Sequence, residues 1–236
     1  MKKIIFIVLV ALGLPTVGFS NNTLVISSST ISDTRDVRNF NSISSGGAMK
    51  VFIRFGDTES LRMEGDREAI ENIVTEVKNS SLNISTKRQR PMLNYSRVSI
   101  YIVAKRLNAL TLNGSGELRV ENPFRSEAFK VVMNGSGSIK ANGTFGSVIG
   151  TVNGSGNIKL DGNTNQASVV VNGSGRFDGS KFRANTLKSS VAGSGSITSG
   201  VKNSLSANLT GSGSINYIGD PQVTSKKIGS GRIRKV

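Results

Sequence analysis

The stretch Met133-Asn134-Gly135-Ser136-Gly137-Ser138-Ile139 decides the fold, because its central Gly-Ser-Gly occurs seven times in the second half of the chain. Successive copies begin 18 to 21 residues apart, usually with an apolar and a small polar residue before them and an aliphatic residue or Phe two positions after. A period of this length is the signature of a repeat architecture. We expect structural corners at the glycines Gly114, Gly116, Gly135, Gly137, Gly154, Gly156, Gly173, Gly175, Gly193, Gly195, Gly211, Gly213, Gly229 and Gly231.

A second, looser turn signal lies between the copies, for example at Asn142-Gly143 and Asp161-Gly162. Short strands between two kinds of turn fit either an antiparallel meander of hairpins or a parallel β-solenoid with one repeat per coil. In a solenoid, equivalent residues stack about 4.8 Å apart, where identical charges would repel. The residue before each copy is Asn, Asn, Asn, Asn, Ala, Thr or Ile, and is never charged. The sequence therefore predicts an all-β fold, a right-handed parallel β-helix (β-solenoid) of about seven coils.

Two sets of apolar residues stand at fixed distances from the corners and should stack into a narrow, continuous core. The set after the corner is Leu118, Ile139, Ile158, Phe177, Ile197, Ile215 and Ile233. The set before it is Leu112, Met133, Val152, Val171, Val191 and Leu209.

The segment before the repeats differs from them and is expected to form a strand-rich cap with a short helix. Residues 47–57 alternate like a strand that ends in a turn, and residues 97–104 form another strand that leads into the first coil. We expect a helix over Asp66–Asn72, with Asp66 as its N-cap. Residues 75–85 fit a hairpin that turns near Asn79-Ser80 as well as they fit more helix.

The N-terminus resembles a secretory signal, with two lysines, an apolar run from Ile4 to Leu14 and small residues before a predicted cleavage site after Ser20. The expected organisation is a signal peptide at 1–20, an extended segment at 21–40, the cap at 41–105 and the solenoid at 106–236, continuous with the cap. The chain has no Cys for a disulfide or a lipid anchor. We expect an exported protein without a membrane span in its mature part, located in the periplasm, at the outer membrane or outside the cell.

Removing Lys2 and Lys3 leaves 28 basic and 15 acidic residues, a net charge of +13. This excess favours anionic partners, and for an exported protein these are acidic polysaccharides or envelope components rather than nucleic acid. The basic segment Lys87-Arg88-Gln89-Arg90-Pro91 is the candidate anion-binding patch, through Lys87, Arg88 and Arg90. The alternative is an exposed loop without a specific partner.

The chain resembles the family of putative autotransporter adhesin head domains, also called GIN domains, which are common in secreted proteins of Bacteroidetes-type bacteria. The resemblance rests on the entry segment 45–51 with its Gly56-Asp57 turn, the Gly-Ser-Gly series, and Tyr217-Ile218-Gly219-Asp220-Pro221. It covers residues 35–236 and implies a right-handed β-helix with an adhesive role. No catalytic residues come with it.

The composition excludes several kinds of catalytic site. Without His or Cys the chain has no Ser-His-Asp or Cys-His site and no His or thiolate zinc ligand. A carbohydrate-active enzyme would need paired carboxylates, and Asp161 and Asp178, at comparable positions of successive coils, could form such a pair or an ion site. Both also suit turns, because each precedes a Gly.

We therefore expect an exported, non-catalytic binding or structural module of the bacterial envelope or surface, without cofactor or metal. It would resemble an adhesin and bind anionic glycans. The alternative is a β-helix polysaccharide lyase or hydrolase, which a groove with two facing carboxylates would favour.

Overall fold

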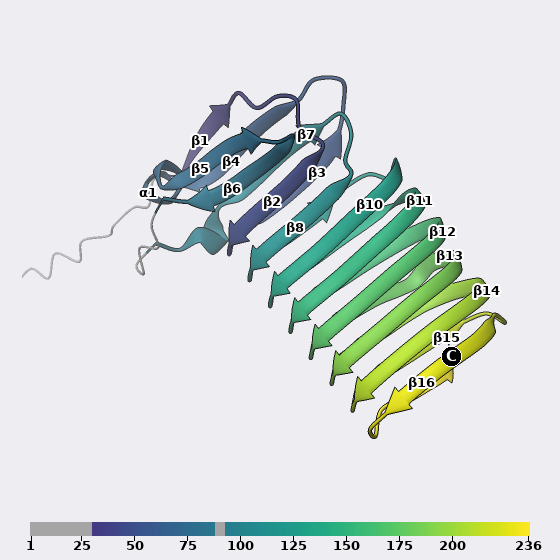
Figure 1. Cartoon of the computed structure of the whole chain (residues 1–236). Coiled ribbons are helices and arrows are strands. Elements are labelled where there is room, and N and C mark those ends of the chain that lie inside the picture. Colours follow the sequence, from purple (N-terminus) through teal and green to yellow (C-terminus); the bar gives the residue numbers. More distant parts are fainter. Residues whose placement is uncertain (1–29, 88–92) are drawn as a thin grey trace, which may run out of the picture.

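The computed structural model describes residues 30–87 and 93–236, about three quarters of which are in strands (Figure 1). The predicted signal segment, Arg88 and Arg90 lie outside the described residues. The N-terminal elements are β1 (Thr30–Arg35), β2 (Ser42–Gly47), β3 (Lys50–Phe55), β4 (Ser60–Asp66), α1 (Arg67–Glu71), β5 (Ile73–Lys78), β6 (Ser81–Thr86), the 3-10 turn η1 (Tyr95–Arg97) and β7 (Ser99–Ala104). The repeat region contains β8 (Ala109–Gly114), β9 (Glu117–Val120), β10 (Phe124–Gly135), β11 (Ser138–Gly154), β12 (Asn157–Gly173), β13 (Arg176–Gly193), β14 (Ser196–Gly211), β15 (Ser214–Ile218), β16 (Gln222–Ile228) and β17 (Arg232–Lys235).

The repeats form the predicted solenoid of stacked parallel coils. Each of the strands β11 to β14 follows most of one coil, and equivalent positions pair in parallel, so that Gly135 lies opposite Gly154 and Gly154 opposite Gly173. We call the bend at the Gly-Ser-Gly triplets the corner. The opposite bend, the far bend, lies at Gly146, Asn165 and Asn185, where the strand pairing skips a residue. Pairing continues through Asn142-Gly143, so the far bend comes a few residues after the turn signals seen in the sequence.

Two flat faces connect the bends. The upstream face consists of the segments that precede the corners: residues 109–113, 130–134, 149–153, 168–172, 188–192, 206–210 and 224–228. The downstream face consists of the segments that follow the corners, from β9 to β17.

The corners are held by backbone hydrogen bonds between coils. The N–H groups of Ser136 and Gly137 both donate to the carbonyl oxygen of Gly114, at 3.1 and 3.0 Å, and the next coils repeat this arrangement. The first glycine of each triplet has a positive φ, between 106° and 137°. This conformation is disfavoured for a residue with a Cβ atom, which explains why Gly recurs there.

The register confirms the two predicted apolar columns. Ile139 lies opposite Leu118 and Ile158, Met133 lies opposite Leu112 and Val152, and the columns continue to Ile233 and Leu209. Apart from the half-buried Ile233, their members are almost completely buried. A cluster of aromatic rings with centroids 5.0 to 5.2 Å apart fills the interior near the far bend of the first coils; it consists of Phe55, Phe124, Phe129 and Phe145.

The N-terminal region continues the solenoid, but the coils do not stack in chain order. The coil formed by β2 and β3 lies between the coil of β6 and β7 and the coil of β8 and β9. The predicted strand β7 therefore precedes the first repeat in the chain but pairs with β3 and β4. Gly47, with φ 87°, lies opposite Gly114 and forms a further corner without a Gly-Ser-Gly sequence.

Antiparallel strands close the N-terminal end. β1 pairs with β4, and β5 pairs with β6. The β5–β6 hairpin turns at Asn79 and Ser80, which both have positive φ, so the hairpin is the correct alternative for residues 75–85. The short helix α1 begins after Asp66, although the Asp66 side chain makes no capping hydrogen bond.

Candidate ligand-binding groove

A groove with a volume of about 520 Å³ lies along the far bend of the coils that contain β11 to β15. Its floor is apolar and is formed by Phe145, Ala184, Val201 and Ile218. Its wall and rim are polar and consist of Thr144, Asn163, Thr164, Asn165, Arg183, Asn185, Lys202, Gly219 and Asp220. We call it the Asn groove.

A change in coil length shapes the groove. The coil from Gly173 to Gly193 spans 20 residues, and each of the next two spans 18. Gly179 and Arg183 pair with the adjacent residues Ser199 and Gly200, so residues 180–182 have no pairing partners in β14. Arg183 and Ala184 follow this unpaired segment, and the two shorter coils contribute Val201, Lys202 and residues 218–220 to the C-terminal end of the groove.

Arg183 is fixed in the rim by its backbone surroundings. Its Nη1 donates to the carbonyl oxygens of Ser180 at 2.8 Å and Phe182 at 3.2 Å. The side chain passes closely over Gly200, where a Cβ atom would lie 2.4 Å from Cδ of Arg183. A guanidinium has five N–H donors, and the Nε and Nη2 donors of Arg183 have no acceptor among the described residues. They are free to bind a ligand.

Amide side chains form short ladders between the coils at the groove wall. The Asn185 Nδ2 donates to Oδ1 of Asn165 at 3.2 Å, and the Thr144 hydroxyl donates to Oδ1 of Asn163 at 3.0 Å. Thr164, 5% exposed, contacts the carbonyl oxygens of Gly146 and Gln166 through its hydroxyl. The ladders hold the amides in fixed positions while leaving Asn163 and Asn165 exposed.

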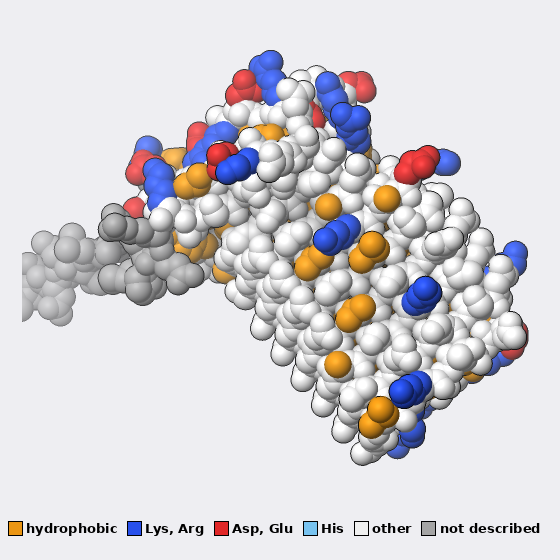
Figure 2. Space-filling view, viewed as in Figure 1, with side chains coloured by type: hydrophobic (Ala, Val, Ile, Leu, Met, Phe, Trp, Pro, Cys, Tyr) orange, Lys and Arg blue, Asp and Glu red, His pale blue; other side chains and the backbone are white. Residues whose placement is uncertain are grey.

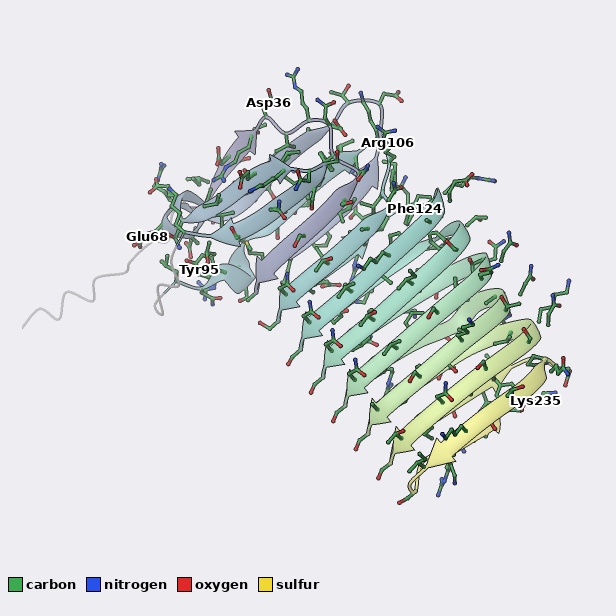
Figure 3. The ribbon with its side chains drawn as sticks, in the orientation of Figure 1. Asp36, Glu68, Tyr95, Arg106, Phe124 and Lys235 are labelled. Atoms are coloured by element: carbon green, nitrogen blue, oxygen red, sulfur yellow. The ribbon has the colours of Figure 1, made fainter. Side chains whose placement is uncertain are left out.

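The groove lies in the strongly basic part of the molecule. Residues 128–236 contain 13 basic and three acidic residues, a net charge of +10. Asp220 is the one carboxylate that lines the groove, and its Oδ1 accepts a hydrogen bond from Lys235. Lys202 has no ion-pair partner among the described residues. Figure 3 shows Lys235 at the C-terminal end of the solenoid and the acidic Asp36 and Glu68 on the cap at the opposite end.

The residues predicted as sites lie elsewhere. Lys87 is exposed at the end of β6, and its backbone N–H donates to the carbonyl oxygen of Asn72 at 2.9 Å. Because Arg88 and Arg90 lie outside the described residues, the basic patch remains a prediction. No residue of the Asn groove was among the predicted binding residues. The shortening of the repeat from 20 to 18 residues per coil is the signal of the groove that the sequence contains.

The prediction that Asp161 and Asp178 lie at comparable positions of successive coils was wrong. Asp178 stands five residues after its corner and pairs with Lys159, whereas Asp161 stands seven residues after its corner and pairs with Asn142. Among residues 30–87 and 93–236, no three acidic side chains gather in a way that could hold a metal ion.

Comparisons with known proteins agree with the solenoid fold. A family model described as "Putative auto-transporter adhesin, head GIN domain" matches residues 39–221. The chain belongs to this family. No curated protein matches it.

Solved structures share the fold of this GIN-domain chain. A putative adhesin from Bacteroides fragilis has a TM-score of 0.85 and 26% identity, with 89% of this chain and 98% of that chain covered. A putative lipid binding protein from Parabacteroides distasonis has a TM-score of 0.74 and 24% identity, with the same coverage. A putative adhesin from Parabacteroides merdae has a TM-score of 0.72 and 17% identity, covering 89% and 97%.

In the part of the chain that the structure describes, no helix has the length and apolar character needed to cross a membrane.

Proposed function

We propose that this GIN-domain chain is an exported, non-catalytic, adhesin-like module of the bacterial envelope or surface that binds anionic glycans in the Asn groove. The observation that carries the proposal is the groove itself. It places the exposed cations Arg183 and Lys202 beside fixed amide ladders and over an apolar floor.

Each part of the groove suits one part of an acidic sugar. A guanidinium can bind a carboxylate or sulfate through two parallel hydrogen bonds, and Arg183 has unused donors for this contact. The amides of Asn163 and Asn165 offer donors and acceptors for hydroxyl groups. The floor at the half-buried Ile218 can accept the apolar face of a sugar ring, in keeping with binding sites that are mostly apolar with a few well-placed polar groups.

The number of carboxylates that line the Asn groove favours a binding role over a catalytic one. Glycoside hydrolysis commonly needs two carboxyl groups that flank the scissile bond. The Asn groove has Asp220 alone, and Lys235 engages it. This arrangement favours the binding module over a β-helix lyase or hydrolase.

The proposed location follows from the family and from the N-terminal segment. We propose that residues 1–20 are a signal peptide cleaved after Ser20, followed by the extended segment 21–40, the cap 41–105 and the solenoid 106–236. Mass spectrometry of the protein from its native host should find a mature N-terminus at Asn21. A chain that keeps Met1 and stays inside the cell would contradict export.

Calorimetric titration with an oligogalacturonate and with its neutral galactose counterpart tests the groove. We expect binding of the uronate alone, weakening as salt rises. The double variant R183Q/K202Q should lose about 100-fold or more in affinity, since each of its two lost hydrogen bonds to a charged group contributes about 1.5–3 kcal/mol. Binding of neither oligosaccharide, or equal binding of both, would contradict the proposal.

K50Q/K159Q is the matched control, because it removes the same charge from β12 on the downstream face and from β3, which pairs with β9 and extends that face. Neither lysine has an ion-pair partner among the described residues. This control should bind like the wild type. An equal loss in this control would show a non-specific charge effect. A loss confined to R88Q/R90Q would move the site to the basic patch near Lys87.

A further inference from the structure

The upstream face is unusually regular. Its segments pair in unbroken register from β8 to β14 and on to β16, whereas the register shifts of the coils all lie outside it, between residues 159 and 186. Figure 1 shows these segments as parallel arrows in one flat layer. Seven rows about 4.8 Å apart give a surface about 30 Å long.

The outward side chains of this face include no acid. They are Ala109, Thr111, Asn113, Lys130, Val132, Asn134, Ile149, Thr151, Asn153, Ser168, Val170, Asn172, Lys188, Ser190, Ala192, Ser206, Asn208, Thr210, Thr224, Lys226 and Ile228. Figure 2 shows orange and blue side chains scattered over this white surface, with the red ones on the cap and at the margins. The face is therefore purely cationic where it is charged.

An apolar patch lies between two of the lysines. Ile149 is 51% exposed, whereas the other exposed large hydrophobic side chains of the described residues, Val223, Ile228 and Val236, lie near the C-terminus. Lys130 pairs with Ile149, and Lys188 stands in the same column two coils further on. Val132 and Val170 are half-buried in the adjacent column on either side of Thr151.

The charge and flatness of the upstream face limit the kind of partner that it can bind. A second copy docked through the same face would bring lysines against lysines, with no carboxylate between them. A partner that inserts a side chain would need a hollow, and the Asn groove lies along the far bend and not on this face. The face fits a partner that is flat, extended and anionic, and that accepts a few aliphatic side chains.

We propose that the upstream face binds the surface of an anionic lipid bilayer, with Lys130 and Lys188 at the phosphate level and Ile149 inserted between them. Lysine stems can lie along apolar surface while their ammonium groups stay among the head groups. Each basic residue near such a surface strengthens binding about fivefold. This surface is separate from the Asn groove, so the two proposals can fail independently.

Co-sedimentation of the full-length protein with vesicles of phosphatidylcholine and phosphatidylglycerol, against pure phosphatidylcholine, tests this inference. We expect K130Q/K188Q to lower the partition coefficient on anionic vesicles by about 30-fold. I149S should lower it several-fold, because it removes apolar surface from the bilayer. The control K50Q/K159Q carries the same change of charge on the opposite face and should bind like the wild type. All variants share the same N-terminal segment, so differences among them report the face.

Three outcomes would overturn the proposal. The first is equal loss in K130Q/K188Q and K50Q/K159Q, and the second is equal binding of the wild type to neutral vesicles. The third is that K130Q/K188Q weakens binding to a soluble polyuronate but not to anionic vesicles, which would make the face a glycan surface. Circular dichroism should show that each variant keeps the strand content of the wild type.

Discussion

At the scale of single residues, the Gly-Ser-Gly corner depends on the lack of a side chain. Gly154 has φ 114°, and a Cβ atom there would lie 2.7 Å from the carbonyl oxygen of Gly135 in the previous coil. That oxygen is the acceptor for the N–H groups of Ser155 and Gly156, at 3.0 and 2.8 Å. A larger residue would therefore strain its own backbone and disturb the hydrogen bonds that join two coils.

We expect Gly154→Ala to lower the free energy of unfolding by about 3 kcal/mol, because a residue held in a disfavoured backbone region costs about 1–3 kcal/mol before any steric clash. Urea denaturation followed by circular dichroism measures this change. Gly46→Ala is the matched control, since its Cβ atom would meet no atom closer than 3.7 Å and its φ is not positive. A Gly154→Ala variant as stable as the control would contradict the corner's dependence on glycine.

At the scale of elements, stacking brings side chains of successive coils into ladders. At the edge of the upstream face, next to the corner, Asn134, Asn153 and Asn172 form a chain in which each Nδ2 donates to the Oδ1 of the preceding Asn, at 2.8 to 3.0 Å. On the downstream face, Glu117 Oε1 accepts from Lys140 Nζ at 3.0 Å and from Arg119 Nη2 at 3.0 Å. Both ladders join coils that follow one another in the chain.

The Glu117 ladder should make stability depend on pH. Burial works to raise the pKa of Glu117, but the hydrogen bonds and charges of Lys140 and Arg119 outweigh it and hold this pKa below its ordinary value of 4.5. A lowered folded-state pKa contributes stability above the unfolded-state value, and this contribution disappears as pH falls through the folded-state value.

We expect Glu117→Gln to be less stable than the wild type by at most about 1 kcal/mol at pH 7, because the pair is partly exposed. The difference should shrink once pH falls below 4.5. Thermal unfolding of both proteins at several pH values measures it. A difference that stays constant down to pH 3 would show that the ion pairs do not cause it.

Elements with a repeated local sequence pattern could be predicted, whereas elements that depend on pairing between distant strands could not. The corners and the two apolar columns repeat at fixed distances, so the sequence alone predicted them. Gly47 was missed as a corner because its Gly-Gly-Ala context lacks the motif, although it pairs with Gly114. The placement of β2 and β3 between other coils leaves no trace in a single sequence, since it concerns strands that are distant along the chain.

At the scale of the whole molecule, charge and shape are distributed unevenly. Residues 128–236 carry 13 of the 30 basic residues but three of the 15 acidic ones, and the Asn groove and most of the upstream face belong to this part. The composition indicated an anionic partner but not its binding site. The groove lies where coils of different length meet. The Asp161 and Asp178 prediction failed because the two residues stand at different distances from their corners.

The most direct test of the proposed glycan-binding site is an NMR titration of the ¹⁵N-labelled protein with an oligogalacturonate. We expect the largest chemical-shift changes at the backbone amides of Asn163–Asn165, Arg183–Asn185 and Lys202, growing in parallel with one dissociation constant. Changes confined to the region around Lys87, or no changes at a saturating concentration of the oligosaccharide, would contradict glycan binding in the Asn groove.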